Sequence, residues 1–329
     1  GRRVAVLASG DPFLHGAGAA IAQALAPGEW RALPGPSALA LAAARLGWAE
    51  EDTTRIALHA APFGRLRPHL APGARILALL RDGEAPTALA AHLAGLGFGA
   101  TRMVVMEALG GPRERIREAR AEKFKISGIA HPVLAALEVR GMGPALPAAG
   151  RPDEFFGHDG QITKQPVRAL TLSALAPRPG ERLWDIGAGS GSISIEWLLA
   201  HPANSAIAVE ADPARAARIR ENAGRLGADR LFVFEGRAPS ALVGKAPPDA
   251  VFIGGGLSAA MLEKIWPLMP ESARLVANAV TLESEALLAA QHAARGGALL
   301  RIELSDAAPL GGKRGWSPRR PITQWSVTK

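Results

Sequence analysis

The chain has 329 residues, of which 48% are hydrophobic and 21% charged, and its net charge is +8. This length predicts about two domains, and the composition excludes a wholly disordered chain. The absence of cysteine excludes disulfides, cysteine-ligated zinc and thiol nucleophiles.

No apolar run approaches the roughly 18–20 residues of a membrane helix, and no signal peptide is visible, so we expect a cytoplasmic protein. The eight histidines show no metal-binding spacing, and no metal site is expected. The last 23 residues hold five basic residues and no acid. This local excess of positive charge suits a small polyanionic ligand, but a solvated tail remains an equal alternative.

The first half of the chain alternates apolar strand patterns with alanine-rich helix patterns, which predicts an α/β layer. Predicted strands cover residues 4–8, 31–34, 54–58, 75–80, 102–106 and 134–139. Predicted helices cover residues 17–26, 38–46 and 85–96, and Ser37 is suited to cap the second of them.

A segment rich in glycine and proline, residues 141–152, separates the halves. We therefore expect a first domain at 1–143, a linker at 144–151 and a second domain at 152–329. In the second domain, helices are predicted at 163–175, 193–200 and 213–226, and strands at 181–186, 206–210, 231–234, 250–253 and 274–277. This alternation predicts a doubly wound, Rossmann-like sheet with ligand chemistry at the carboxyl ends of its strands.

A glycine-rich loop, Gly187-Ala-Gly-Ser-Gly191, directly follows the first strand of the second domain and precedes a helix. Glycines there let the backbone turn tightly and approach a ligand. The dinucleotide fingerprint needs a third glycine at position 192, where this chain has Ser192. Asp185 precedes the loop, and a carboxylate there suits a cationic amino-acid group better than a pyrophosphate.

The loop resembles motif I of class I S-adenosylmethionine-dependent methyltransferases, and Glu210 ends the next strand, where such enzymes place the acid for the ribose hydroxyls. Residues 249–256 resemble the fourth-strand motif of the same class, which borders the methyl-acceptor pocket. The resemblance implies S-adenosylmethionine as cofactor. It implies these cofactor-binding residues: Thr163, Asp185, Gly187, Ala188, Gly189, Ser190, Gly191, Glu210, Gly236, Arg237 and Ala238.

From Pro152 onward, the segment around residues 151–168 and the sequence Ile193-Ser-Ile-Glu196 are similar to the decarboxylating precorrin C-15 methyltransferases. The first half resembles the tetrapyrrole methylase superfamily. Four residues carry that second likeness as cofactor-binding candidates: Gly10, Asp11, Pro12 and Ser37. Members of the superfamily begin with a further glycine-rich loop before the Gly-Asp-Pro turn, so we expect the N-terminal lobe of this domain to be largely absent.

The order of the two domains resembles the bifunctional, decarboxylating C5,15 precorrin methyltransferases of cobalamin biosynthesis. The resemblance implies conversion of precorrin-6B to precorrin-8X, with methylation at C-5 and C-15 and loss of the C-12 acetate carboxyl. A homo-oligomer is expected, with neither nucleic acid nor membrane as partner. Catalytic candidates are Glu196, Glu283 and His158. Candidates for binding substrate carboxylates are Arg168, Lys313, Arg314, Arg319 and Arg320.

Three other functions remain to be weighed against this one. A class I methyltransferase acting on RNA, protein or another small molecule would share the cofactor site. A module that binds nucleic acid or another anion through the basic C-terminus would show strong salt dependence and no cofactor effect. An oxidoreductase that uses NAD is disfavoured by Ser192.

Overall fold

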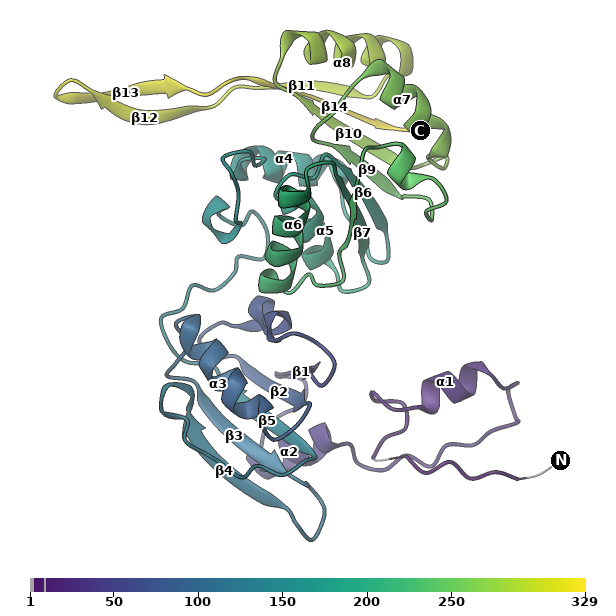
Figure 1. Ribbon diagram of the computed structural model, residues 1–329, viewed down its shortest axis with the longest axis vertical. Helices are drawn as coiled ribbons and strands as arrows, with labels where there is room; N and C mark the ends of the chain where they lie inside the picture. Colours follow the sequence, from purple (N-terminus) through teal and green to yellow (C-terminus); the bar gives the residue numbers. More distant parts are fainter. Residues whose placement is uncertain (1–2, 9) are drawn as a thin grey trace. The chain divides into compact units, whose positions relative to one another are not determined.

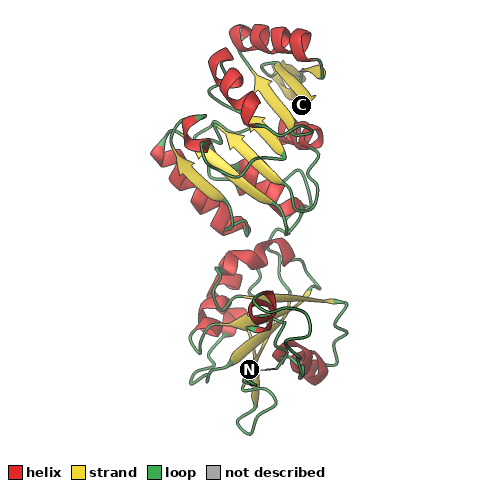
Figure 2. Cartoon of the chain, turned by 90° about the vertical axis from the view of Figure 1, so that its right-hand side faces the viewer, coloured by secondary structure: helices red, strands yellow, loops and turns green. Residues whose placement is uncertain are grey.

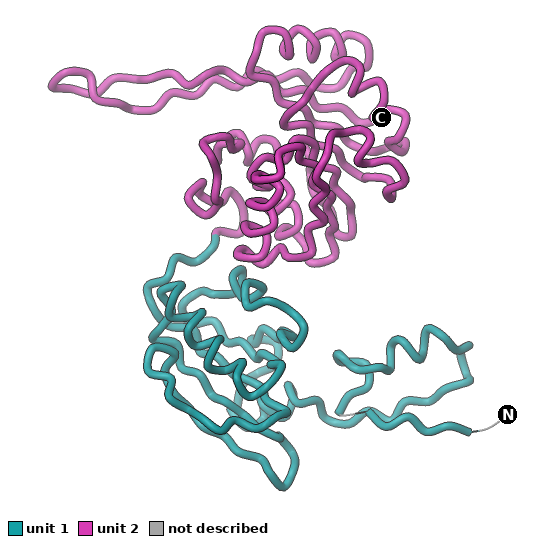
Figure 3. Tube along the Cα trace, in the orientation of Figure 1, with its two compact units in different colours: residues 1–146 teal, residues 147–329 magenta. Residues whose placement is uncertain are grey.

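The structure is a computed structural model that describes residues 3–8 and 10–329, so Ser9 of the Gly-Asp-Pro region lies outside the described residues. The chain divides into two compact units, residues 1–146 and 147–329 (Figure 3). Within the described ranges, every helix is too short or too polar to cross a membrane.

The first unit contains a five-stranded sheet in the order β1-β2-β5-β3-β4 (Figure 1). Its strands are β1 (Thr53–Ala57), β2 (Arg75–Leu80), β3 (Arg102–Glu107), β4 (Arg115–Arg120) and β5 (Val133–Glu138). β1 and β2 are parallel, whereas β5 pairs with β2 and β3 in antiparallel fashion and β3 pairs with β4 likewise. Its helices are α1 (Gly18–Gln23), α2 (Ala38–Leu46) and α3 (Ala85–Gly95), with short 3-10 turns at Phe63–His69 and Ala121–Lys123.

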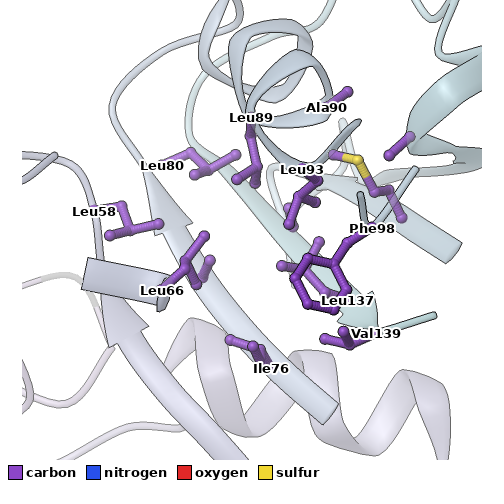
Figure 4. Close-up of a cluster of buried hydrophobic side chains, with 14 of the residues drawn as sticks. Leu58, Leu66, Ile76, Leu80, Leu89, Ala90, Leu93, Phe98, Leu137 and Val139 are labelled. Atoms are coloured by element: carbon purple, nitrogen blue, oxygen red, sulfur yellow. The ribbon is translucent and has the colours of Figure 1, made fainter. Parts of the chain in front are cut away.

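Both faces of this sheet are covered, which explains why its central strands are apolar throughout instead of alternating. On one face, Ile76 and Leu137 belong to one buried cluster with Leu89 and Leu93 of α3 (Figure 4). On the other face, residues such as Leu77, Val104 and Leu134 pack against α2. Ser37 caps α2 as predicted, because its hydroxyl accepts a hydrogen bond from the Ala40 N–H at 3.1 Å.

Two predictions in the first unit are wrong, and both concern residues before α2. Residues 4–8 form no strand and are exposed, with Leu7 97% accessible. Residues 31–34 also form no strand. A strand needs a neighbour to satisfy its backbone groups, and no described strand pairs with either segment. The edge strand β4 was not predicted, because its charged residues obscure the alternation of apolar and polar side chains that indicates a strand.

The second unit contains a seven-stranded sheet in the order β11-β14-β10-β9-β6-β7-β8. Its strands are β6 (Arg182–Ile186), β7 (Ser205–Glu210), β8 (Phe232–Glu235), β9 (Ala250–Ile253), β10 (Arg274–Ala279), β11 (Ala298–Ile302) and β14 (Ile322–Thr328). The five strands β6 to β10 are parallel, and β14 is antiparallel to both β10 and β11. The strand order reverses between β6 and β9, which is where a doubly wound sheet binds its ligand.

Helices cover both faces of this sheet (Figure 2). They are α4 (Gln165–Leu175), α5 (Ser192–Ala200), α6 (Pro213–Leu226), α7 (Ala259–Ile265) and α8 (Leu282–Arg295), with 3-10 turns at Asp153–Phe155, Ser240–Leu242 and Trp266–Leu268. Met261, Leu262 and Leu288 bring α7 and α8 into one buried cluster with Trp325 of β14. α4, α5 and α6 contact one another in sequence order, and α4 also contacts β10 and β14.

A two-stranded hairpin, β12 (Ser305–Leu310) with β13 (Lys313–Pro318), lies between β11 and β14. It extends away from the seven-stranded sheet (Figure 1). Its large apolar side chains are exposed, as the 78% accessibility of Trp316 shows. None of β11 to β14 was predicted from the sequence.

Candidate active site

A cavity of about 1000 Å³ opens at the carboxyl ends of β6, β7, β9 and β10. Each of these strands contributes a wall through its last residues or the loop that follows. The sequence candidates that line the cavity are Thr163, Gly187, Ala188, Gly189, Ser190, Glu210, Gly236, Arg237, Ala238 and Arg320. The cavity therefore gathers loops that are far apart in the chain, as the order reversal of the sheet predicts.

The glycine-rich loop lines the cavity and leads into the amino end of α5. Gly187 has φ +67°, and a Cβ there would lie 2.6 Å from the Gly255 Cα. Gly191, the N-cap of α5, has φ +73°, and its Cβ would lie 2.7 Å from the Ile219 Cγ2. A side chain at either position would be strained by the positive φ; at Gly187 it would also collide with the backbone of Gly255, and at Gly191 with the side chain of Ile219 in α6, so both positions favour glycine.

Glu210 ends β7 and its carboxylate is fixed beside the glycine-rich loop. One oxygen accepts from the Gly189 N–H at 2.8 Å, and the other accepts from the Asp212 N–H at 3.0 Å. The residue is only 7% exposed, yet it lines the cavity. Each carboxylate oxygen has a further lone pair, so the group can still accept two hydroxyl donors from a ligand.

Asp185 lies beneath the loop and is buried rather than part of the cavity wall. One of its oxygens accepts from both the N–H and the hydroxyl of Ser194, at 3.2 and 2.5 Å. The other oxygen has no hydrogen-bond partner in the described part of the chain. Burial raises the pKa of Asp185 to about 6, and the nearby charge of Glu210 adds to the rise, against the Ser194 hydrogen bonds that lower it.

The cavity lining also includes basic side chains. Lys264 of α7 and Arg320, which precedes β14, both line the cavity, and neither forms an ion pair with a described carboxylate. Lys164 also lines it and lies 3.8 Å from Asp153. Sequence analysis identified Arg320 but missed Lys264, because an isolated lysine in an amphipathic helix carries no sequence signal. Asn278, near the end of β10, was also missed, because its hydrogen-bond partners are far away in the sequence.

Two candidates, Arg168 and Glu196, form a buried ion pair instead of facing the cavity. Their side chains are 0% and 1% exposed, and the Arg168 Nε lies 2.7 Å from a Glu196 oxygen. Arg168 also donates to Asp153 at 3.0 Å and to the Arg151 carbonyl. All four groups belong to the segment that precedes β6 and the helices it packs against. The structure therefore gives this pair a role in holding residues 150–168, and neither residue lines the cavity.

The remaining candidates of the second unit also lie outside the cavity lining. His158 is exposed, and its Nδ1 accepts from the Gly160 N–H at 3.0 Å. Glu283 is exposed in the first turn of α8. Lys313 and Arg314 belong to the extended hairpin, and Arg319 forms an exposed ion pair with Asp306. Sequence analysis assigned these residues to the site from their positions along the chain. Those positions do not determine where the side chains lie in the fold.

In the first unit, the structure brings the four candidate residues together. Gly10 has φ +69°, and a Cβ there would lie 3.0 Å from the Pro36 carbonyl oxygen and 3.3 Å from the Ser37 Cα. The Asp11 carboxylate accepts from the Phe13 N–H at 2.8 Å, which closes the turn through Pro12. The Gly-Asp-Pro turn thus lies against the loop that starts α2.

Comparison with known proteins gives consistent matches for both units. The family described as tetrapyrrole (corrin/porphyrin) methylases matches residues 1–125, and the one described as precorrin methyltransferase domain matches residues 154–329. A precorrin-6Y C(5,15)-methyltransferase [decarboxylating] from Sinorhizobium sp. is 53% identical over 100% of this chain and 81% of its own length.

Two further relatives match the second unit. A cobalt-precorrin-6B C(15)-methyltransferase (decarboxylating) from Salmonella typhimurium is 35% identical over 52% of this chain and 91% of its own length. The crystal structure of the C-terminal domain of precorrin-6Y C5,15-methyltransferase from Rhodobacter capsulatus is 52% identical, with a TM-score of 0.54. That match covers 56% of this chain and all of the solved domain.

Proposed function

The chain belongs to the family of decarboxylating precorrin-6Y C(5,15)-methyltransferases, and we propose that its second unit methylates C-15 of a precorrin with loss of a carboxyl group. The relative that matches this unit alone is itself named as a decarboxylating C(15)-methyltransferase. The first unit matches the tetrapyrrole methylases, and we assign it the C-5 methylation. The protein is thus a methyltransferase of cobalamin biosynthesis, for which we keep the cytoplasmic location and the homo-oligomer as predictions.

The observation that carries the proposal is that two chemically different sets of residues line one cavity, and we call them its first and second walls. The first wall is defined by the glycine-rich loop and the fixed carboxylate of Glu210. The second wall is defined by the cationic side chains of Lys264 and Arg320. A cationic, hydroxyl-bearing cofactor fits the first wall, and a substrate with several carboxylates fits the second.

The first wall fits S-adenosylmethionine, which supplies an electrophilic methyl group. Glu210 is placed to accept hydrogen bonds from the ribose hydroxyls, because its own anchoring bonds leave both oxygens with free lone pairs. Gly187 and Gly189 allow the ligand to approach the backbone, and Asp185 adds negative charge beneath the loop. Residues 236–238, which follow β8, are assigned to the adenine edge.

The second wall serves to bind and orient the substrate. The meso carbons of a precorrin are enamine-like nucleophiles, so methyl transfer depends mainly on alignment of donor and acceptor. Arg320 and Lys264 are placed to bind the acetate and propionate groups that surround the ring. These two residues replace the larger set of carboxylate-binding residues expected from the sequence. Arg168 is buried in an ion pair, and Lys313 and Arg314 lie on the extended hairpin.

Turnover of precorrin-6B with S-adenosylmethionine, followed by mass spectrometry, tests the proposal. The Glu210→Ala variant is expected to weaken cofactor binding at least tenfold and to abolish C-15 methylation. Glu235→Ala is the matched control, because Glu235 is the partner of Glu210 in the β7–β8 ladder but is 48% exposed, pairs with Arg220 and does not line the cavity. Unchanged turnover in Glu210→Ala, or no turnover of any precorrin by the wild type, would refute the proposal.

A further inference from the structure

Three polar side chains meet on one face of the second sheet, next to the cavity. Asn278 of β10 and Gln324 of β14 are direct partners in the antiparallel ladder, so their side chains share a face. Thr171 of α4 packs onto that face. Thr171 and Gln324 are 0% and 3% exposed, whereas Asn278 is partly exposed and lines the cavity.

The hydrogen bonds among these residues fix the orientation of both amides. The Thr171 hydroxyl donates to the Val167 carbonyl at 2.8 Å, so its oxygen is left to act as an acceptor. It accepts from the Asn278 Nδ2 at 2.9 Å and from the Gln324 Nε2 at 3.1 Å. The Gln324 Nε2 also donates to the Asn278 Oδ1 at 2.9 Å. Reversal of either amide would place donor against donor or acceptor against acceptor.

The network leaves one N–H available at the cavity. Gln324 uses both N–H groups of its amide on Thr171 and Asn278. Asn278 uses one N–H on Thr171, and its second N–H has no protein acceptor among the described residues. Buried polar groups cost stability unless they are satisfied, and these three residues satisfy one another across α4, β10 and β14. An amide held in one orientation at a cavity wall is a preorganised hydrogen-bond donor.

We propose that Asn278 contacts the substrate and donates its free N–H to a carboxylate oxygen of the precorrin, with Thr171 and Gln324 as positioning residues. The inference rests on the proposed function, which places the carboxylate groups along the wall formed by Lys264 and Arg320. Lys264 and Arg320 attract the carboxylates by their charge, whereas Asn278 fixes the orientation of one carboxylate. A single amide N–H forms a hydrogen bond in one direction, which a flexible ammonium group does not. The shared chemistry, a carboxylate acceptor, also occurs in S-adenosylmethionine, so the test separates the two ligands.

The decisive variant is Asn278→Asp, which keeps the shape of the side chain and replaces the donor by a negative charge. We expect kcat/KM for precorrin-6B to fall about 10- to 100-fold, which is the effect of a lost hydrogen bond to a charged group. Most of the fall is expected in KM, while affinity for S-adenosylhomocysteine, measured by calorimetry, changes less than twofold. Asn278→Ala, which adds no charge, should show a smaller fall in the same direction.

Thr171→Val tests the positioning role, because it keeps the shape of the side chain and removes the acceptor of both amides. We expect kcat/KM to fall about three- to tenfold with cofactor affinity unchanged. Ser326→Ala is the matched control: Ser326 lies two residues along β14 on the same face as Gln324 and pairs with Val276, not Asn278. It should retain wild-type kinetics, and the melting temperature of every variant reports whether the fold is kept.

Four results would overturn the inference. Wild-type kinetics in Asn278→Asp would show a purely structural network. A fall in cofactor affinity without a fall in precorrin affinity would assign the N–H to the cofactor carboxylate. An equal loss in Ser326→Ala would show a general disturbance of the strand. Direct binding of precorrin-6B in the presence of S-adenosylhomocysteine separates this inference from the proposed function: equal binding by wild type and Asn278→Asp refutes the contact even where turnover fails for another reason.

Discussion

Each unit buries a carboxylate at the end of a strand, but Glu107 in the first and Asp185 in the second are held in different ways. Both are 1% exposed. Burial alone would raise the pKa of Glu107, but hydrogen bonds from Arg115, the Ala130 N–H and Arg117 outweigh it and lower that pKa to about 2. Among the described residues, Asp185 accepts hydrogen bonds only from Ser194, and burial raises its pKa to about 6.

The difference lies in how far the protein itself satisfies each carboxylate. Glu107 accepts from two guanidinium groups and one backbone N–H, so its bonding capacity is used within the protein. Asp185 has one oxygen with no hydrogen-bond partner in residues 3–8 and 10–329, and it precedes the glycine-rich loop that lines the cavity. Unfavourable burial of an under-bonded acid is typical of functional sites, where a ligand supplies the missing charge. Glu196 resembles Glu107 in this respect, because its carboxylate is paired within the protein, with Arg168.

The largest expected effect concerns the buried ion pair between Glu196 and Arg168. Arg168→Ala removes the fully buried guanidinium that lies 2.7 Å from Glu196, together with its bonds to Asp153 and the Arg151 carbonyl, and leaves Glu196 with the more distant Arg151, at 3.4 Å, as its cation. We expect a loss of about 3–5 kcal/mol in the free energy of unfolding, measured by urea denaturation. Because Arg168 does not line the cavity, the KM for precorrin of any folded fraction should remain near that of the wild type. A large rise in KM with normal stability would return Arg168 to the substrate site.

Glu107→Gln should have the next largest effect, because it removes the negative charge of a buried carboxylate that pairs with two arginines. We expect a loss of about 3 kcal/mol, at the low end for buried pairs since Arg115 and Arg117 are partly exposed. Glu118→Gln is the control on the neighbouring strand: its 61% exposed side chain pairs with Arg102 and should contribute less than about 1 kcal/mol. Equal losses in the two variants would contradict the distinction.

The two acids should also give opposite pH dependences of stability. The stabilisation from Glu107 is present above its usual pKa of 4.5 and is lost as pH falls toward 2. For Asp185, the folded state holds the proton more tightly than the unfolded state, so stability falls as pH rises from about 3.8 to about 6. That fall amounts to roughly 3 kcal/mol, and Asp185→Asn should abolish it. Denaturation series across this pH range in wild type and variant provide the measurement.

The smallest expected effect is on cofactor affinity. A cationic ligand favours the ionised form of Asp185, so S-adenosylmethionine should bind about three- to tenfold more tightly at pH 7 than at pH 5. Calorimetry at the two pH values, with Asp185→Asn as comparison, measures this difference. A pH dependence that persists unchanged in Asp185→Asn would assign it to another group.

The elements that sequence analysis predicted well are those with strong local signals. Helix α6 has its predicted bounds, Pro213–Leu226, because a proline begins it and Gly227 ends it. The glycine-rich loop was located because its spacing is specific and it follows a buried strand. Residues 4–8 have the same apolar pattern as a strand, but whether a strand forms depends on a neighbour that local sequence does not show.

In the candidate site too, residues with a local sequence signal were predicted correctly, and residues whose role depends on distant partners were not. Thr163 and Glu210 were identified by their place in a motif, and both line the cavity. Arg168 and Glu196 were assigned to substrate and chemistry because charged residues near a motif suggest function, yet they neutralise each other in the interior. Asn278 was overlooked because its importance depends on partners 107 and 46 residues away in the chain. Pairing across elements is the information that a single sequence lacks.

The most direct test of the account is to measure carbon dioxide and methylated product together. Precorrin-6B and S-adenosylmethionine are incubated with wild-type protein and with Glu210→Ala, and both products are quantified by mass spectrometry. If the cavity of the second unit carries both steps, the variant loses C-15 methylation and carbon dioxide release in the same proportion. Release of carbon dioxide by Glu210→Ala at the wild-type rate would place decarboxylation outside this cavity and contradict the account.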